Sequence, residues 1–190
     1  KVLWSTAAWA PSVIAPSPVP LPDGRVFLTA GYGAGSAMLR VSRAEGGFRV
    51  ELLYEVEPGE GLSCEQQTPI LYKDRLFGIL PKDAGAMRRQ FACYRPRGEF
   101  AWPSGKARRY GLGPFMIADG KFYILNDDGT LNMARASVDV FIPLDSLRVL
   151  DGPDAWGPFA IAGRKLVLRD SHRMVCIDIG EKEKDVFRDE

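Results

Sequence analysis

The fold is decided by residues 113–124, which read Gly-Pro-Phe-Met-Ile-Ala-Asp-Gly-Lys-Phe-Tyr-Ile. Two short apolar runs flank Asp119-Gly120, and an Asp-Gly pair supplies the positive φ angles that a tight hairpin turn requires. The runs are continuous rather than alternating, which is typical of strands buried on both faces. Pro114 is tolerated where the first strand begins, because no ladder donor is needed there. The stretch therefore predicts a buried β-hairpin.

The same pattern occurs four times: a small residue, a proline, an apolar run, a turn, a basic residue and a second apolar run. The four segments are 17–28, 68–78, 113–124 and 157–168. Successive prolines of the pattern are 51, 45 and 44 residues apart. A period of about 45 residues is typical of the blades of a β-propeller.

Further strands are expected after each hairpin. A third strand is clearest at 129–134 and 173–178, and a fourth is expected near 48–56, 99–102 and 139–149, although 144–150 is also a weak helix candidate. A four-stranded blade cannot bury its own faces, so it must stack on neighbours. We predict an all-β fold, a β-propeller of about four four-stranded blades in a single domain. The expected blades are about 15–56, 65–105, 112–150 and 156–180, followed by a charged tail at 181–190.

The composition excludes several other classes of protein. Gly and Pro make up 34 of the 190 residues, and breakers this frequent disfavour a helical bundle. No apolar run approaches the ~18 residues that span a membrane, so no membrane span is predicted. The net charge of +1 gives no overall field that favours nucleic acid. Aromatic and basic residues do not alternate regularly either, so we expect no nucleic-acid partner.

The few cysteines and histidines limit the chemistry. Three cysteines cannot all pair, and one histidine excludes a zinc site built on several histidines. His172 lies beside Asp170 and Ser171 in a turn, where the three cannot form a catalytic relay. Asp127 and Asp128 are residues that turns commonly use, and no EF-hand loop is present. We predict no catalytic residue and no metal ligand.

Residues 92–102 read Ala-Cys-Tyr-Arg-Pro-Arg-Gly-Glu-Phe-Ala-Trp. They resemble the tryptophan-docking repeat A-x-D-x-x-T-G-x-x-x-W of pyrroloquinoline quinone (PQQ)-type propellers. Ala92, Gly98 and Trp102 match, whereas Tyr94 and Arg97 replace the usual Asp and Thr. Members of this family usually have seven or eight blades. The resemblance therefore implies the C-terminal part of a longer member, about half of a ring, in the periplasm or another extracytoplasmic compartment.

The same resemblance places residues 1–4 in the outer strand of a preceding blade or of a closing blade, because Trp4 follows a short strand-like run. The ring would be completed by another protein chain or by the missing N-terminal half of the propeller. A self-closed ring of four blades and a ring of two chains are the alternatives. A half-ring alone would expose two apolar blade faces, which demands a partner.

Ligand-binding residues are expected in the loops that lead into the first strand of a blade, because these loops lie at the propeller axis. Glu65 and Gln67 precede the hairpin of the second blade and would hold a cation or a sugar hydroxyl. Trp156 occupies the equivalent place before the fourth blade and would stack on a flat ligand. Ordinary loop polarity, backbone capping and core packing are the alternative roles for these three residues.

Charge is distributed unevenly between neighbouring blades. Residues 82–109 contain eight basic side chains against two acidic ones, whereas residues 119–154 contain seven Asp against three basic side chains. Neighbouring blades of opposite net charge would steer a partner or pair with each other, or their charged side chains would form a solvated rim.

We predict a non-catalytic binding or scaffold module that mediates protein or ligand interaction, with no cofactor. The alternative is part of a quinoprotein alcohol dehydrogenase, in which PQQ and calcium would activate the alcohol. The resemblance implies that such an enzyme carries an adjacent Cys-Cys pair near the quinone, and this sequence has none.

Overall fold

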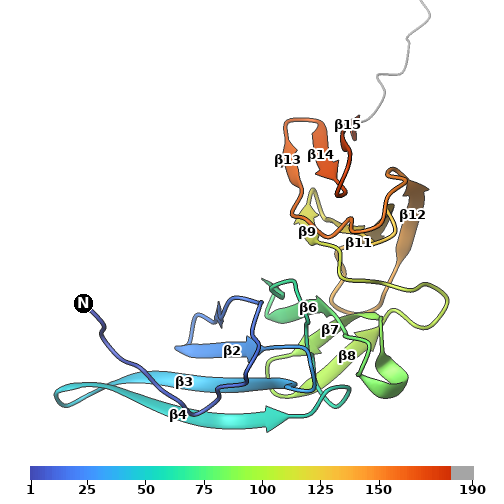
Figure 1. The fold of residues 1–190 in the computed structure, drawn as a ribbon. Helices are drawn as coiled ribbons and strands as arrows, with labels where there is room; N and C mark the ends of the chain where they lie inside the picture. Colours follow the sequence, from blue (N-terminus) through green and yellow to red (C-terminus); the bar gives the residue numbers. More distant parts are fainter. Residues whose placement is uncertain (181–190) are drawn as a thin grey trace, which may run out of the picture.

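The computed structural model describes residues 1–180, in which fifteen strands form four antiparallel sheets that follow one another in chain order. The first three sheets have four strands each and the last has three, and we call them blades 1–4. Figure 1 shows the blades arranged along an open arc, from blade 1 at the lower left to blade 4 at the top. No helix in residues 1–180 is long and apolar enough to cross a membrane.

Within each blade, every strand pairs with the strand next to it in the sequence. Blade 1 contains β1 (Val19–Pro20), β2 (Arg25–Thr29), β3 (Ser36–Ala44) and β4 (Gly47–Val56). Blade 2 contains β5 (Ile70–Tyr72), β6 (Arg75–Ile79), the 3₁₀ turn η1 (Gly85–Met87), β7 (Phe91–Arg95) and β8 (Glu99–Pro103). Blade 3 contains β9 (Phe115–Ala118), β10 (Lys121–Leu125), β11 (Thr130–Arg135) and β12 (Pro143–Arg148). Blade 4 contains β13 (Ala160–Ala162), β14 (Lys165–Arg169) and β15 (Met174–Asp178). The weak helix candidate at 144–150 is therefore mostly strand β12.

Tight turns join the first two strands of the blades. In blade 3, Asp119 and Gly120 have φ angles of 48° and 66°, as the Asp-Gly pair predicts. In blade 2 the turn is made by Lys73 and Asp74, with φ angles of 47° and 56°. Positive φ is unfavourable for residues that carry a Cβ, so the pairing of β5 with β6 holds this turn against its local preference.

The core consists of three apolar clusters, one between each pair of successive blades. Strand β7 shows why both faces of a blade are apolar. Ala92 and Tyr94 belong to the cluster between blades 1 and 2, whereas Phe91 and Cys93 belong to the cluster between blades 2 and 3. Side chains alternate between the two faces of a strand, so a continuous apolar run supplies both clusters.

Aromatic rings fill the cluster between blades 2 and 3. Phe122 of blade 3 lies 4.8 Å from Phe77 and 4.9 Å from Phe91 of blade 2, measured between ring centroids. Trp102 is 6% exposed and lies 5.6 Å from Phe141. These distances are within the range in which aromatic pairs add to the stabilisation from burial alone. Trp102 of the residue 92–102 motif thus packs against the following blade.

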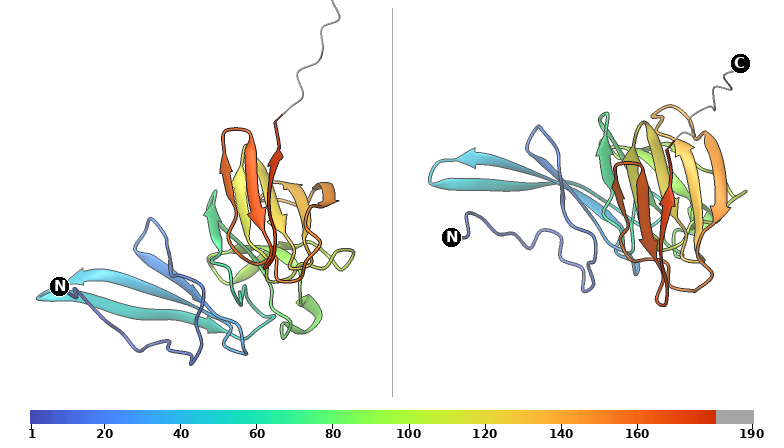
Figure 2. Two further views of the ribbon diagram at one scale, coloured as in Figure 1. Left: turned by 45° about the horizontal axis from the view of Figure 1, so that its top comes forward. Right: turned by 90° about the horizontal axis from the view of Figure 1, so that it is seen from above.

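The two ends of the arc differ from the middle. Met174 on β15 is 68% exposed, and Cys176 is exposed beside it, so the outer face of blade 4 lies open in the described chain. Figure 2 shows the hairpin of β3 and β4 projecting away from the stacked blades 2–4. Leu3 and Trp4 border a shallow cavity near the tip of that hairpin.

Residues 1–4 form no strand in the structure. They do not close blade 4, because they lie at the other end of the arc from β15 (Figures 1 and 2). No apolar cluster joins blade 4 to blade 1 within residues 1–180, so the described chain is not a self-closed ring of four blades. The assignment of residues 1–4 to a preceding blade stays a prediction, and the expected tail at 181–190 lies outside the described residues.

Candidate functional site

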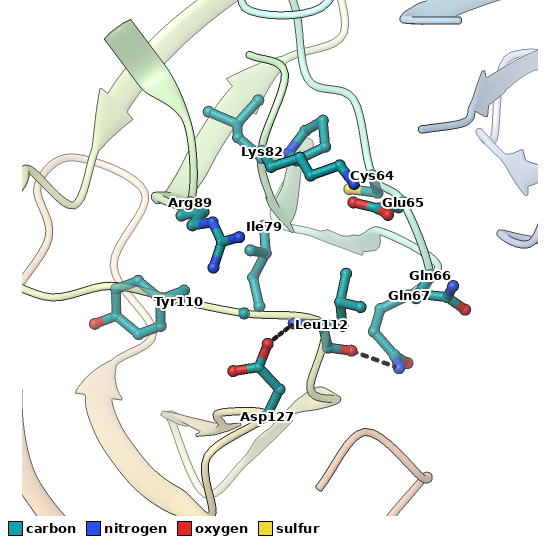
Figure 3. Close-up of a pocket in the computed structure, with 13 residues that line it drawn as sticks. Cys64, Glu65, Gln66, Gln67, Ile79, Lys82, Arg89, Tyr110, Leu112 and Asp127 are labelled. Atoms are coloured by element: carbon teal, nitrogen blue, oxygen red, sulfur yellow. Dashed lines mark hydrogen bonds between the residues drawn. The ribbon is translucent and has the colours of Figure 1, made fainter. Parts of the chain in front are cut away.

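One edge of the arc carries the candidate site. The loops that lead into the first strands of blades 2 and 3, and the loops between the second and third strands of the same blades, emerge at this edge and surround a cavity of about 160 Å³. Its lining is formed by residues 64–67, 79–82, Arg89, 110–112 and Asp127. Figure 3 shows these side chains converging from four separate loops. We call this space the small cavity.

Glu65, predicted as a ligand-binding residue, lies in the wall of the small cavity and is 9% exposed. The preceding residue is fixed to blade 1, because the backbone N–H of Cys64 donates to Thr29 Oγ1 at 2.8 Å. A Cβ on Gly31 would lie 2.6 Å from Glu65 Cγ, so the loop of blade 1 approaches Glu65 too closely for any residue but glycine. Glu65 is thus held at a defined position beside the cavity.

Gln67, also predicted as a ligand-binding residue, joins three blades. Its Nε2 donates to the carbonyl oxygen of Leu112 at 3.3 Å and to that of Trp156 at 3.2 Å. Those two carbonyls belong to the loops that lead into blades 3 and 4. The amide therefore positions loops, and its two donors are occupied by backbone.

Trp156, the third predicted residue, is linked to Gln67 only through its backbone carbonyl. Its side chain is 40% exposed and borders a neighbouring cavity of about 460 Å³, together with Gln66 and Asp170. The structure therefore brings Glu65 and Gln67 to one cavity and the Trp156 ring to the next. The ligand-binding role of all three stays a prediction.

Asp127 lies across the small cavity from Glu65 (Figure 3). Its carboxylate accepts two hydrogen bonds from the Arg109 guanidinium, at 2.5 and 2.8 Å, and a longer one from the Leu112 N–H at 3.4 Å. The Arg109 hydrogen bonds hold the pKa of Asp127 below its usual value, although desolvation opposes the shift. Asp127 is therefore an anion that ties its own blade to the loop leading into it.

Blade 4 repeats this arrangement with Asp170. Its carboxylate accepts from the N–H groups of His172 at 2.8 Å, Arg173 at 2.6 Å and Gly152 at 3.0 Å, and the first two lower its pKa most. A side chain at Gly111 or Gly152 would overlap the carboxylate of Asp127 or Asp170, respectively. A Gly–Asp pair therefore recurs at equivalent places in two blades. The aspartates serve as turn and loop anchors, as the sequence predicted for Asp127.

A second, larger cavity adjoins the small one, and sequence reasoning did not single it out as a site. It has a volume of about 500 Å³. Its lining consists of Gly85, Ala86, Arg88, Arg89, Gln90, Lys106, Arg108 and Arg109. We call it the basic cavity, because five of its eight lining residues are Arg or Lys. Arg89 lines both cavities. The excess of basic residues in 82–109 was the signal in the sequence, but their convergence depends on how two loops fold together.

The two buried thiols are not activated as nucleophiles. Burial raises the pKa of both Cys64 and Cys93 to about 12, which leaves the thiols protonated at neutral pH. His172 is exposed in the turn capped by Asp170. Within residues 1–180, no group of three or more His, Cys, Asp or Glu side chains is arranged to hold a metal ion.

Comparisons with known proteins bear on the fold. No protein-family model matches the chain, and neither does any curated protein sequence. Among solved structures, BamB from Moraxella catarrhalis is similar over 85% of this chain and 41% of its own, with a TM-score of 0.57 and 13% identity. BamB is a β-propeller protein. The chain described here has a β-propeller fold.

AztD from Citrobacter koseri is a weaker structural match. It is similar over 86% of this chain and 56% of its own, with a TM-score of 0.48 and 14% identity. The propeller chain spans about two fifths of the length of BamB and somewhat over half the length of AztD.

Proposed function

We propose that this chain is a non-catalytic propeller module that binds another protein, either a separate chain or the remaining part of a longer propeller. One observation carries the proposal: the Gln67 amide and the Asp127 carboxylate of the candidate site hold blades and loops together rather than activate a reactant. The Gln67 amide and the Asp127 carboxylate both bind loop backbone, and the buried thiols are protonated. The accessible parts of the site are charged side chains and cavities, and these suit binding.

The open face of blade 4 supports a protein partner. Met174 and Cys176 are exposed on β15, and the half-buried Val167 of β14 is the cross-strand partner of Cys176 on the same face. Each of the three inner interfaces buries a cluster of apolar residues against a neighbouring blade. The outer face of blade 4, which carries Met174, Val167 and Cys176 beside the Lys165–Asp178 ion pair, has no such neighbour within residues 1–180. Its burial by a further sheet would continue the propeller.

The alternative is part of a quinoprotein alcohol dehydrogenase, with PQQ and calcium. The adjacent cysteine pair that the resemblance implies for such an enzyme is absent from this sequence, which favours the binding module. An extracytoplasmic location is part of the proposal and rests on the resemblance of residues 92–102 to PQQ-type repeats.

Native material tests the proposal. We expect light scattering to give an assembly, or a longer chain, well above 21.0 kDa, and absorption spectra to show no bound quinone. Met174→Lys should weaken that assembly, because it places a charge on the outer face of blade 4. Glu60→Lys, in the exposed loop after β4, is the control and should leave it intact. A 21 kDa monomer, or one equivalent of quinone per chain, would contradict the proposal.

A further inference from the structure

The small cavity and the basic cavity share Arg89 in their linings, and we call the two together the basic cleft because basic side chains predominate in their combined lining. Six basic side chains and two acidic ones line it. The basic residues are Lys82, Arg88, Arg89, Lys106, Arg108 and Arg109, and the acidic ones are Glu65 and Asp127. The chain as a whole has a net charge of only +1, so this excess of four positive charges is local.

Of these cations, only Arg109 forms an ion pair among the described residues, although Arg89 also lies close enough to Asp127 to help lower the pKa of its carboxyl. Arg109 is paired with Asp127, and Arg108 donates to the amide oxygen of Asn132 at 3.1 Å. The side chains of Arg88, Arg89 and Lys106 make no hydrogen bond or ion pair within residues 1–180. Like charges gathered in a cleft repel one another and attract an anion, which lowers the repulsion when it binds.

The backbone holds these cations in place. Arg89 adopts a positive φ of 56°, which is unfavourable for a side-chain-bearing residue. Its N–H donates to the Leu80 carbonyl at 3.0 Å, and its own carbonyl accepts from the Tyr110 N–H at 2.9 Å. The next side chain, Gln90, is buried and donates to the Ala86 carbonyl at 3.1 Å. The loop between β6 and β7 is thus tied at several points, which fixes where the Arg88 and Arg89 side chains leave the backbone.

The small cavity provides an apolar compartment beside the basic side chains of the cleft. Its floor is formed by Ile79, Leu80, Tyr110 and Leu112, and Figure 3 shows Arg89 beside Ile79 at its edge. An apolar cavity of about 150 Å³ accepts a molecule the size of benzene. At about 160 Å³, the small cavity matches a single Leu or Phe side chain.

We propose that the basic cleft binds an acidic peptide segment of a partner protein. Its carboxylates contact Arg88, Arg89 and Lys106, and one apolar side chain of the segment enters the small cavity. Guanidinium groups bind carboxylates in a bidentate manner, which favours this ligand. Single-stranded nucleic acid is disfavoured, because the only aromatic ring in the lining, Tyr110, is 1% exposed and offers no stacking surface. The inference rests on the proposed function, since it names the chemistry of the protein partner.

The test is binding of the whole chain to a fluorescein-labelled Glu-Asp-Leu-Glu-Asp-Glu peptide, measured by fluorescence anisotropy. The variant Arg88→Glu/Lys106→Glu should weaken binding by on the order of tenfold, because it replaces exposed attractive pairs with repulsive ones. Raising the ionic strength should weaken binding as well. Both substituted residues are exposed, so the fold does not depend on them.

The matched control is Lys73→Glu/Arg97→Glu. It produces the same change in net charge, but its residues lie in the turns at the opposite edge of blade 2. This control should bind the peptide within about twofold of the parent chain, because exposed charges separated by more than a Debye length are largely screened. Replacing the peptide leucine with serine should cost about tenfold or more, since burial of a Leu side chain is lost.

Three results would overturn the proposal: equal losses in the two charge variants, equal binding of the leucine and serine peptides, or tighter binding of an oligothymidine of the same charge. Its failure is distinguishable from failure of the proposed function. If native material assembles through blade 4 while the peptide gives any of these three results, the module function stands and the cleft assignment is wrong. If the peptide binds as expected but native material is a quinone-loaded monomer, the cleft assignment stands and the proposed module function is wrong.

Discussion

Blade 2 and blade 4 contain the same hairpin pattern but differ in what covers them. In blade 2, Phe91 packs toward blade 3 and Tyr94 toward blade 1, and both are fully buried. In blade 4, Leu166 is buried toward blade 3, whereas Met174 is 68% exposed on the other side. The repeated sequence therefore makes a sheet that needs two neighbours. The stability of a blade depends on its place in the series as much as on its own residues.

The largest effect is expected at the interface between blades 2 and 3. Phe91→Ala should lower the free energy of unfolding by about 3–5 kcal/mol, because it removes a buried ring that contacts aromatic residues of both blades. Urea denaturation followed by tryptophan fluorescence measures it. A loss below about 1 kcal/mol would show that this cluster does not hold the two blades together.

The next prediction compares thiols in the two regions. At pH 8, Cys176 on blade 4 should react with a thiol reagent, whereas Cys64 and Cys93 should not react in the folded chain. A thiol pKa near 12 instead of 9 lowers the thiolate fraction by about a thousandfold. One fast thiol of three in a reagent titration is the expected outcome, and slower modification of Cys176 in native assembled material would locate the partner on blade 4. Three equally fast thiols would contradict the buried positions.

A smaller effect is expected at the anchor of blade 3. Asp127→Asn should lower the free energy of unfolding by about 1 kcal/mol at pH 7, because the charged hydrogen bonds with Arg109 are lost from a partly exposed pair. The pKa of Asp127 is depressed by folding, so the stabilisation is full above its unfolded pKa and disappears as the pH falls through its lower, folded pKa. Urea midpoints of parent and variant should therefore converge in acid. An equal difference at pH 7 and in acid would rule out the ion pair as the cause.

The smallest effect is expected on the open face. Met174→Ser should change the stability of the isolated chain by no more than about 0.5 kcal/mol, because the side chain is mostly exposed. The same substitution should weaken the native assembly. Phe91→Ala, in contrast, should act mainly on the stability of the chain itself. A large loss of stability in the isolated chain would mean that the outer face of blade 4 is already covered.

The features that follow from local chemistry were predictable from the sequence. The hairpin at Asp119-Gly120, the repeat of about 45 residues and the all-β propeller fold were predicted and are confirmed. The turn at Lys73-Asp74 has no glycine, and its positive φ angles are imposed by the pairing of β5 and β6 rather than by composition.

The candidate site was predictable only in part. Glu65 and Gln67 were expected in the loop that leads into blade 2, and that loop lines the small cavity, but the contacts of the Gln67 amide reach residues 45 and 89 positions away. Such contacts exist only once the blades have stacked, so spacing along the chain does not reveal them. The same holds for Arg89 and Lys106, which come from different loops to one cavity.

The pairing of every strand with its sequence neighbour has a kinetic consequence. Each blade closes only short loops when it forms, so its own contacts are local and its assembly is fast. We expect the contacts between blades to be added one interface at a time, beginning with the buried aromatic cluster around Phe91. Backbone amides of blades 2 and 3 should therefore exchange with solvent last, and those of blade 4 first. We therefore expect unfolding to begin at the outer blades rather than at the interface between blades 2 and 3.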